Sequence, residues 1–361
     1  VNSMPQAPAN LDDLKAIVAT EKQLLPVGNR TKLPLTQCDD ATLVSLRSLQ
    51  GISEYEPSEF TFTALAGTSL DEVQCALAQK NQYLPFDPML VEAGATLGGT
   101  VAAGLSGPGR FRYGGIRDFL LGVQFISGDG KIIRAGGKVV KNAAGFDLPK
   151  YLVGSLGRFG VLTSLTFKVF PKRPVTISLQ VACDSQTQAA SRIAEAAASR
   201  WELDAIDYRP DKQFIFLRLA GPQRACESLA DEIRNLWGSD VSDLQTAEAF
   251  WKSVVELNWF DDGLLAVKVP TTSQQFFKLY DSLAHNEQIQ IHGSVAGNIA
   301  WILLKSSESL SELDTQLSAL ELPGLILRGA CDHPRLGAWQ SSTIQQAIQQ
   351  AMDPAGHFCS F

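Results

Sequence analysis

Residues 94–174 read GATLGGTVAAGLSGPGRFRYGGIRDFLLGVQFISGDGKIIRAGGKVVKNAAGFDLPKYLVGSLGRFGVLTSLTFKVFPKRP, and this stretch decides the fold. Of the 29 glycines in the chain, 17 lie between Gly94 and Gly160. Glycine is costly inside regular structure and is most useful where the backbone turns sharply or approaches a ligand closely. The glycine density therefore indicates a turn-rich β region, and it is also typical of a site that binds a ligand through its backbone.

The charge of the chain is unevenly distributed. The segment from Gly94 to Arg173 contains twelve Lys and Arg residues and three Asp residues, which gives it a net charge of +9. The remainder carries −16, so the overall charge of −7 combines two opposed regions. A basic, glycine-rich segment in an acidic chain indicates a bound anion, and a solvated basic face is the alternative. Nucleic-acid binding is not expected, because the segment has neither interleaved aromatic residues nor a recognition motif.

The length and composition set further bounds. A chain of 361 residues is expected to form about two domains, and 45% hydrophobic with 19% charged residues excludes a disordered protein. No apolar run is long enough to span a membrane, and the first ten residues show no secretory signal. We therefore expect a cytoplasmic protein, with any membrane association through partner subunits.

The cysteines and histidines exclude several cofactor classes. No two cysteines are closer than 28 residues and no CxxC occurs, so we expect neither an iron–sulfur cluster nor a structural zinc. Reduced, buried thiols are expected, because nothing else indicates an oxidising compartment. The basic segment contains no histidine, so a cofactor bound there is expected to be non-covalent. The cysteines are Cys38, Cys75, Cys183, Cys226, Cys331 and Cys359.

Local patterns predict the elements of the first half of the chain. Asn10 is typical of the cap of a helix over the next residues, and Ser69 with Glu72 forms a capping-box pattern at the start of another. Residues 24–35 predict a strand, a tight turn and a second strand. Glycines in the turn 128–130 predict a hairpin. The strands expected around and after this turn cover residues 121–127, 131–135 and 161–170.

The pattern changes after Pro171–Pro174. Glycine becomes rarer, and strands alternate with helices of regular length, which indicates an α+β domain with helices on one face of a sheet. A final helix near 341–352 ends in Asp353-Pro354-Ala355-Gly356, a helix-stop signal. The expected strands cover 175–182, 213–220, 264–269 and 299–304, and the helices lie near 186–200, 222–237, 272–284 and 308–320.

The common nucleotide-binding motifs are absent. Gly98-Gly99-Thr100 with Gly104 does not have the G-x-G-x-x-G spacing, and no acidic residue follows in a βαβ context. No lysine follows a G-x-x-x-x-G pattern either. A Rossmann domain and a P-loop are therefore not expected.

The longer pattern resembles the FAD domain of the vanillyl-alcohol oxidase and p-cresol methylhydroxylase (PCMH) type, and within it the FAD-binding subunits of bacterial glycolate oxidase, which act as glycolate dehydrogenases. KVVKNAAGFDLPK (138–150) and GSLGRFGVLT (154–163) are the most specific pieces, because related flavoenzymes usually carry an acid where Leu156 stands. The likeness runs from PVGNRTK to MDPAGHF, is strong over 91–171 and is weak in the second domain. It implies an α+β chain with a two-lobed PCMH-type FAD-binding domain (1–174), an α+β cap domain with an antiparallel sheet (175–335) and a C-terminal helix (336–361) returning to the first domain.

The resemblance also implies where FAD binds non-covalently. In the family the pyrophosphate lies against a glycine loop, which corresponds to residues 28–32, and a plain hairpin turn is the alternative. Asn29 and Arg30 occupy positions where the family usually has glycine, and Arg tolerates positive φ poorly. The FAD-binding residues implied are Gly28, Asn29, Arg30, Thr31 and Lys32 at the pyrophosphate; Gly94, Ala95, Thr96, Gly98, Gly99 and Thr100 in a second loop; Gly104, Ser106, Gly107 and Arg110 along the flavin; Asn142, Gly145 and Asp147 near the adenine or ribose; and Gly160 and Val161 in a closing strand.

The sequence identifies catalytic residues poorly. Arg112, Tyr113 and Arg117 are weak candidates for a substrate carboxylate or flavin contact, and an Arg117–Asp118 ion pair is the favoured alternative. Family members that oxidise 2-hydroxy acids often carry a metal motif H-x-x-G-D-G-N-x-H in the second domain. Here the stretch 292–300 reads HGSVAGNIA, which lacks the acid and the second histidine, so no metal is expected.

Three functions follow from this pattern. The preferred one is the FAD-binding subunit of a glycolate or other 2-hydroxy-acid dehydrogenase complex, which accepts or relays electrons as glycolate becomes glyoxylate. Its partners would be a companion catalytic flavin subunit and an iron–sulfur subunit. The alternatives are a self-sufficient FAD-dependent oxidoreductase acting on another small substrate and a non-catalytic structural flavoprotein subunit.

Overall fold

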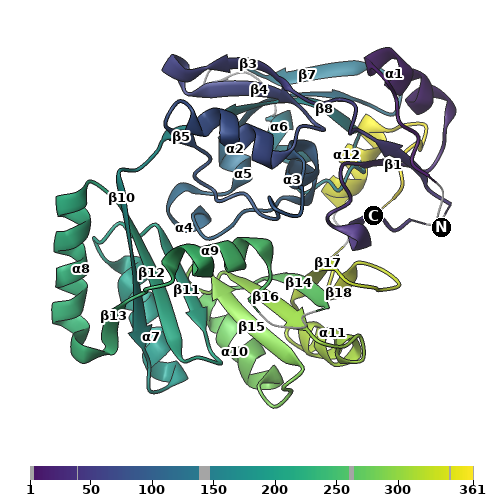
Figure 1. Cartoon of the computed structure of the whole chain (residues 1–361). Helices are drawn as coiled ribbons and strands as arrows, with labels where there is room; N and C mark the ends of the chain where they lie inside the picture. Colours follow the sequence, from purple (N-terminus) through teal and green to yellow (C-terminus); the bar gives the residue numbers. More distant parts are fainter. Residues whose placement is uncertain (1–3, 39, 138–146, 260–263, 341–342, 361) are drawn as a thin grey trace. The chain divides into compact units, whose positions relative to one another are not determined.

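The structure is a computed structural model that describes residues 4–38, 40–137, 147–259, 264–340 and 343–360. The chain divides into two compact units. Unit 1 comprises residues 1–106, 115–172 and 340–361, and unit 2 comprises residues 107–114 and 173–339. Figure 1 labels most of the helices and strands of both units.

The first lobe of unit 1 contains a helix and a small parallel sheet. Helix α1 (Leu11–Thr20) begins where predicted, and the Asn10 side chain accepts hydrogen bonds from the backbone N–H groups of Asp12 and Asp13. Strand β1 (Leu24–Val27) pairs in parallel with β2 (Thr42–Ser45). The second strand predicted near residue 35 is wrong, because residues Leu33–Thr36 form the 3₁₀ helix η1. Pro34 explains the difference, since proline has no N–H for a strand ladder and its φ suits a helical turn.

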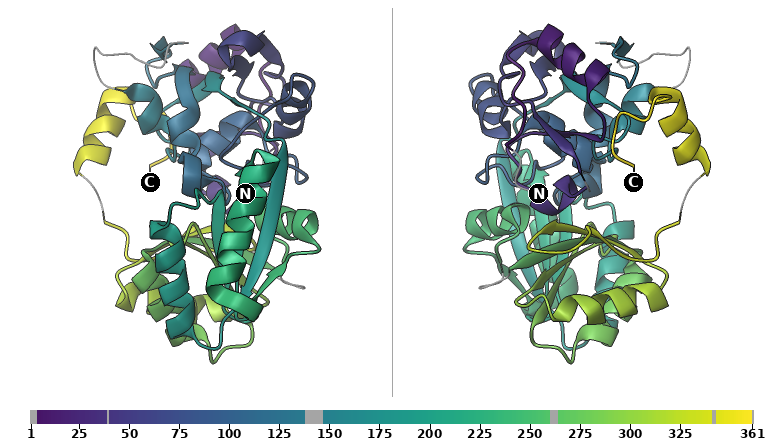
Figure 2. Two further views of the ribbon diagram at one scale, coloured as in Figure 1. Left: turned by 90° about the vertical axis from the view of Figure 1, so that its left-hand side faces the viewer. Right: turned by 90° about the vertical axis from the view of Figure 1, so that its right-hand side faces the viewer.

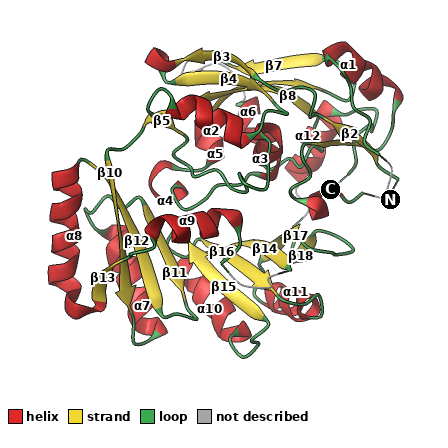
Figure 3. Cartoon of the chain, in the orientation of Figure 1, coloured by secondary structure: helices red, strands yellow, loops and turns green. Residues whose placement is uncertain are grey.

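The second lobe of unit 1 is built on a five-stranded antiparallel sheet in the order β3-β4-β8-β6-β7. Figure 3 labels β3, β4, β7 and β8 of this sheet. The predicted hairpin is confirmed, since β6 and β7 are joined by a turn in which Gly130 has a φ of 73°. The predicted capping at Ser69 is also confirmed, because its side chain accepts from the N–H of Glu72 at 3.1 Å. The strands are β3 (Ile52–Glu56), β4 (Thr61–Leu65), β6 (Leu120–Ile126), β7 (Ile132–Gly136) and β8 (Val161–Lys168), with a β5 (Gln82–Tyr83) and β9 (Phe170–Pro171) pair and the helices η2 (Pro57–Glu59), α2 (Leu70–Ala78), α3 (Leu97–Ala103), α5 (Ile116–Phe119) and α6 (Leu148–Leu152).

The C-terminal segment completes unit 1. Helix α12 (Thr343–Met352) confirms the predicted final helix, and the segment after it runs beside β1 (Figure 2). There the N–H of Leu24 donates to the carbonyl oxygen of His357 at 2.7 Å. Cys359 forms a disulfide with Cys38. The expectation of reduced thiols is therefore wrong for this pair. The two cysteines are 321 residues apart, so the sequence gives no local signal that they pair.

Unit 2 contains a nine-stranded antiparallel sheet in the order β13-β10-β12-β11-β15-β16-β14-β17-β18, which confirms the predicted α+β class. Its strands are β10 (Val175–Ala182), β11 (Ala205–Arg209), β12 (Phe214–Gly221), β13 (Val241–Asp243), β14 (Leu265–Pro270), β15 (Ile289–Ser294), β16 (Ile299–Leu304), β17 (Pro323–Arg328) and β18 (Arg335–Gly337). Its helices are α4 (Arg110–Tyr113), α7 (Gln186–Ala198), α8 (Gln223–Trp237), η3 (Gly238–Asp240), α9 (Ala247–Glu256), α10 (Ser273–Leu283) and α11 (Ser309–Ala319).

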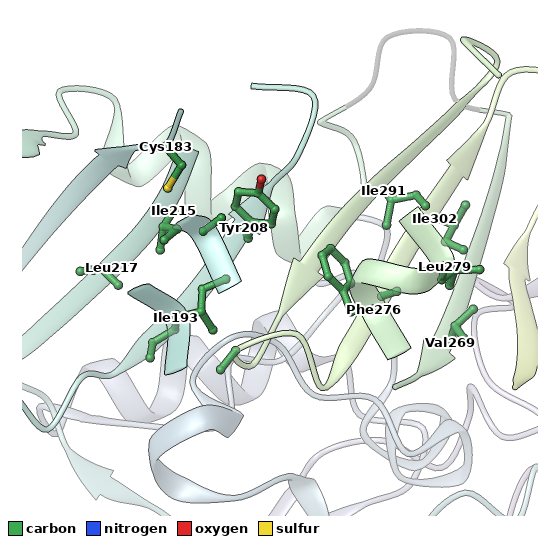
Figure 4. Close-up of a cluster of buried hydrophobic side chains, with 14 of the residues drawn as sticks. Cys183, Ile193, Tyr208, Ile215, Leu217, Val269, Phe276, Leu279, Ile291 and Ile302 are labelled. Carbon is green, nitrogen blue, oxygen red and sulfur yellow. The ribbon is translucent and has the colours of Figure 1, made fainter. Parts of the chain in front are cut away.

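The two faces of this sheet differ in character. One face packs on α7, α8, α10 and α11 in a large apolar core, part of which Figure 4 shows around Tyr208 and Phe276. Helix α9 packs on the opposite face, where Phe250 stacks on Phe216 and the Trp251 indole donates to the Ser178 hydroxyl. The expectation of helices on one face only is therefore incomplete, because alternate strand residues supply an aromatic second face as well.

Candidate functional site

Unit 1 contains a pocket beside the end of β1. Its walls are the loop that follows β1, the helix η1 and one side of α3, so it lies where the sequence places the pyrophosphate loop. The lining residues are Pro26, Val27, Gly28, Asn29, Arg30, Thr31, Lys32, Leu35, Thr36, Thr96, Gly99, Ala102, Ala103 and Leu156.

The loop 28–32 offers unused backbone donors to this pocket. Within the described parts of the chain, no acceptor takes a hydrogen bond from the backbone N–H groups of these residues. Arg30 has a φ of 55°, so it takes the left-handed conformation that glycine takes most easily. Successive N–H groups near a left-handed residue form a concave anion-binding nest. The loop can therefore receive a phosphate although arginine replaces the family glycine.

A hydrogen bond joins this loop to the second predicted loop. The side-chain Nδ2 of Asn29 donates to the carbonyl oxygen of Gly94 at 2.7 Å. Gly94 has a φ of 84°, which a residue with a side chain would adopt only under strain. The polar side chain at position 29 thus fixes the two loops to each other, a role that the usual glycine could not perform.

Small residues keep the pocket open. A Cβ atom on Gly28 would lie 2.2 Å from Oγ1 of Thr96, and a Cβ atom on Gly99 would lie 3.0 Å from the same oxygen. Thr96 itself is fixed, because its hydroxyl caps α3 by accepting from the N–H of Gly99 at 3.2 Å. Glycine at position 28 is therefore required by close approach.

A buried cation lies in the same pocket. Lys32 is 7% exposed, and its ammonium group donates to the hydroxyl of Thr31 at 3.0 Å. Burial lowers the pKa of Lys32 to about 8, because the apolar surroundings disfavour the charged form. An anionic group bound in the pocket would stabilise the charged form, so Lys32 can neutralise a phosphate.

Other residues of the second loop support the pocket without lining it. Gly98 packs against Ala66, since a Cβ there would lie 2.8 Å from both the Cβ and the carbonyl oxygen of Ala66. The hydroxyl of Thr100 donates to the carbonyl of Thr96, and Ala95 accepts from the N–H of Leu70. These residues are therefore scaffold residues of the fold.

The residues predicted farther along the flavin lie in structural positions as well. Gly104 ends α3 in the left-handed conformation, and the Ser106 hydroxyl accepts from the N–H of Ile116 at 2.8 Å. Gly160 packs against Phe125, and Val161 is fully buried in β8. Asp147 is exposed at the start of α6, whereas Asn142 and Gly145 lie outside the described residues.

The segment 107–114 belongs to unit 2, and so Gly107, Arg110, Arg112 and Tyr113 lie there. Arg110 is exposed. Arg112 forms an ion pair with Glu202 at 2.7 Å, and the guanidinium groups of Arg112 and Arg173 lie over the ring of Tyr113. These contacts fasten α4 to its own unit.

Arg117 stays in unit 1, and the expected ion pair with Asp118 is absent among the described residues. The Asp118 carboxylate instead accepts from the N–H of Gly115 at 2.8 Å, and the Arg117 carbonyl accepts from Lys150. The Asp118 carboxylate accepts the backbone N–H at the start of the helix, so the turn is stabilised without an ion pair between Asp118 and Arg117.

Several pocket residues were not predicted. Ala102 and Ala103 lie on α3, and Pro26, Val27, Leu35 and Thr36 flank the loop. Leu156, with a φ of 51°, also lines the pocket. Related flavoenzymes usually carry an acid at position 156, and this difference was the one sequence signal that could have identified Leu156 as a pocket residue.

The stretch 292–300, which the resemblance aligns with a metal motif, contributes to a buried polar cluster around Asp207 in unit 2. Nε2 of His292 lies 2.7 Å from Oδ2 of Asp207, and both residues are buried. The Ser294 hydroxyl and the Val295 N–H also donate to Asp207. Val295 has a φ of 56°, a conformation natural for the glycine of the motif. In the described part of the chain, no three His, Cys, Asp or Glu side chains lie close enough together to hold a metal ion.

Comparisons with known proteins identify the domain that contains this pocket. A profile of the FAD binding domain matches residues 6–136. The chain is 34% identical over 248 residues to the glycolate oxidase subunit GlcE of Escherichia coli strain K12, an alignment that covers 69% of this chain and 68% of that protein. It is also 28% identical over 207 residues to the glycolate oxidase subunit GlcD of Bacillus subtilis strain 168. That alignment covers 55% of this chain and 44% of the Bacillus protein.

More distant similarity supports the fold. Alkyldihydroxyacetonephosphate synthase has a solved structure that matches with a TM-score of 0.71 at 13% identity, covering 98% of this chain and 74% of that one. With the profile match, these similarities define the chain as a flavoprotein of the FAD-linked oxidoreductase class. Within that class it belongs to the family of the glycolate oxidase subunit GlcE. No helix among the described residues is both long and apolar enough to cross a membrane.

Proposed function

We propose that this chain is the FAD-binding subunit of a glycolate dehydrogenase complex, in which it accepts or relays electrons from the oxidation of glycolate to glyoxylate. The observation that carries the proposal is the loop 28–32, which lines a pocket in the FAD-binding domain and whose backbone N–H groups have no acceptor among the described residues. The names of the relatives in Escherichia coli and Bacillus subtilis supply the substrate class.

The residues of the pocket fit the pyrophosphate of FAD. Each hydrogen bond from the loop to a charged oxygen contributes about 1.5–3 kcal/mol, and several N–H groups can contribute together. Lys32 supplies a positive charge inside the pocket, and Gly28 lets the backbone approach the ligand. FAD, when bound, supplies a two-electron acceptor for the hydride of a hydroxy acid. The chain's own role is therefore to hold and orient the dinucleotide.

Unit 2 favours a companion role over an autonomous one. A self-sufficient 2-hydroxy-acid dehydrogenase needs a base for the hydroxyl proton and a cation for the carboxylate. In this chain, Ala296 and Ala300 replace two polar residues of the family motif, and His292 Nε2 is engaged with Asp207. We therefore propose that a catalytic flavin subunit and an iron–sulfur subunit complete the complex, and that these partners carry any membrane attachment.

Experiment can distinguish two alternative functions from this proposal. A self-sufficient FAD oxidoreductase would have its flavin bleached by a small substrate without partners. A structural subunit would never show flavin reduction, even inside the complex. FAD binding to the loop 28–32 is required by the companion subunit and by the self-sufficient enzyme, whereas a structural subunit could bind flavin weakly or not at all.

The test uses the full chain, loaded with FAD under anaerobic conditions. Glycolate should leave the flavin absorbance of the isolated chain unchanged and bleach it when the companion subunits are added. Bleaching of the isolated chain by glycolate would contradict the companion role, and failure to bind added FAD would contradict the whole proposal. Gly99→Val should abolish FAD retention while leaving unit 2 folded, whereas Gly137→Ala is the control, because a Cβ at Gly137 would meet no atom within 4 Å.

A further inference from the structure

The disulfide between Cys38 and Cys359 lies beside two elements that line the pocket, β1 and η1. Cys359 is fully buried in a small apolar cluster with Leu25, Val27, Ala41 and Leu43, and Cys38 packs against this cluster from a partly exposed position. Because Cys359 lies near the end of the chain, the bond attaches the C-terminal segment to the first lobe.

On one side, the disulfide holds the strand that leads into the pocket. Cys359 donates its N–H to the carbonyl of Leu24 at 3.1 Å, and Leu24 donates to His357 at 2.7 Å. The C-terminal segment thus lies along β1, whose last residues, Pro26 and Val27, line the pocket. Releasing this segment would leave an edge of β1 exposed directly before the loop 28–32.

On the other side, the disulfide holds η1. Cys38 follows this helix by two residues, and Leu35 and Thr36 of the helix line the pocket. The carbonyl of Gln37 accepts from Arg158 at 3.4 Å, a long hydrogen bond that holds the same segment. The disulfide therefore connects the β1 side of the pocket to the η1 side.

The C-terminal segment has a second attachment that does not depend on the disulfide. Nδ1 of His357 lies 2.6 Å from the carbonyl oxygen of Glu21, and the N–H of Gly128 donates to the carbonyl oxygen of Met352 at 2.9 Å. The carbonyl of Gln23 lies 3.4 Å from Sγ of Cys359, so a reduced thiol there has an acceptor. Reduction would thus loosen the segment without unfolding unit 1.

We propose that Cys38 and Cys359 form a redox clamp: the disulfide holds FAD in the pocket, and its reduction by a dithiol releases the C-terminal segment and speeds loss of the cofactor. This inference rests on the proposed FAD site. One thiolate of the dithiol attacks Sγ of the more exposed Cys38, the S–S bond breaks, and Cys359 leaves and takes up a proton. The second thiol then attacks the mixed disulfide, so Cys38 is released as a thiol and the dithiol becomes a cyclic disulfide.

The experiment compares FAD release from the full chain before and after treatment with dithiothreitol. Peptide mapping under non-reducing conditions first establishes the Cys38–Cys359 bond after incubation with glutathione disulfide. Flavin fluorescence after dilution then gives the release rate. We expect reduction to speed release about tenfold in the wild type, because a cross-link between distant residues restricts the opened state. The double variant Cys38→Ser/Cys359→Ser should release FAD at the fast rate with or without dithiothreitol.

The control is Cys75→Ser, which removes an exposed thiol elsewhere and should behave as the wild type. Equal release rates from oxidised and reduced wild type, or a double variant that still responds to dithiothreitol, would overturn the clamp. Hydrogen exchange at residues 353–360 tests it independently of FAD, since reduction should speed exchange there and unchanged exchange would overturn the proposal. If the chain does not take up FAD at all, the proposed function fails, and the exchange result still decides whether the clamp opens.

Discussion

Asn29 donates its side-chain amide to the carbonyl oxygen of Gly94 at 2.7 Å, across 65 residues of sequence. This bond joins the loop after β1 to the loop before α3, the two segments that the family resemblance places around FAD. The loop whose backbone N–H groups have no acceptor among the described residues is therefore held in place by one side chain.

Asn29→Ala removes this bond and should weaken FAD binding. A single hydrogen bond contributes about 0.5–1.5 kcal/mol, so the dissociation constant should rise roughly twofold to tenfold. Titration of the FAD-free chain followed by flavin fluorescence measures it. Asn10→Ala is the comparison, because it removes the cap of α1 in the same lobe and should lower thermal stability while leaving the dissociation constant unchanged. An unchanged constant for Asn29→Ala would contradict the role of the bond.

Lys32 should make FAD binding depend on pH. Without ligand the pKa of Lys32 is lowered to about 8 by burial, and a bound phosphate raises it again. Below about pH 8 the lysine is charged in both states, so affinity should be constant there. Above about pH 8 binding must take up a proton, and affinity should fall as the pH rises until the bound-state pKa is passed.

Two substitutions separate charge from shape at this position. Lys32→Met should raise the dissociation constant about tenfold to a hundredfold at neutral pH and abolish the decline above about pH 8. Lys32→Arg should keep tight binding at high pH, because arginine stays charged. Without FAD, the wild type should gain stability from about pH 8 to pH 10.5, since the unfolded chain binds the proton that the folded chain has lost. A wild-type affinity that is flat over this range would contradict the assignment.

Gly28 tests the close approach of backbone and ligand. Gly28→Ala places a methyl group 2.2 Å from the hydroxyl of Thr96, so the loop must move away from α3. We expect loss of FAD retention on purification, with unit 2 unaffected. Gly28→Ala/Thr96→Ser removes only the methyl of the threonine and leaves the clash with its oxygen, so it should remain defective. Gly28→Ala/Thr96→Ala should recover part of the binding, and failure of both double variants alike would argue against the clash.

Sequence alone predicted the elements that short-range chemistry determines. The helix after Asn10 and the hairpin at Gly130 follow from one side-chain cap and one turn, and both are present. The strand expected near Leu35 is a 3₁₀ helix, because the apolar pattern is ambiguous over so few residues and Pro34 decides it.

Features that depend on tertiary contacts could not be read from the sequence. The pairing of Cys38 with Cys359 joins residues 321 positions apart, and α9 covers a sheet face that only the full strand order defines. In the pocket, the loop 28–32 was identified through family resemblance. Ala102 and Leu156 line the pocket because of how α3 packs beside that loop. No local sequence pattern encodes this packing.

Arg30 provides a test of the backbone itself. Its φ of 55° raises the free energy of the folded state by about 1–2 kcal/mol for a residue with a Cβ, whereas glycine adopts this conformation without that cost. Arg30→Gly should therefore be more stable than Arg30→Ala, even though glycine adds flexibility to the unfolded chain and offsets part of the gain. Both substitutions remove the same charge, so their difference in unfolding free energy isolates the conformation. Urea denaturation of the two FAD-free variants measures it, and FAD affinity should be equal in both because the N–H groups keep their positions. Greater stability of Arg30→Ala would show that residue 30 does not hold the left-handed conformation in solution.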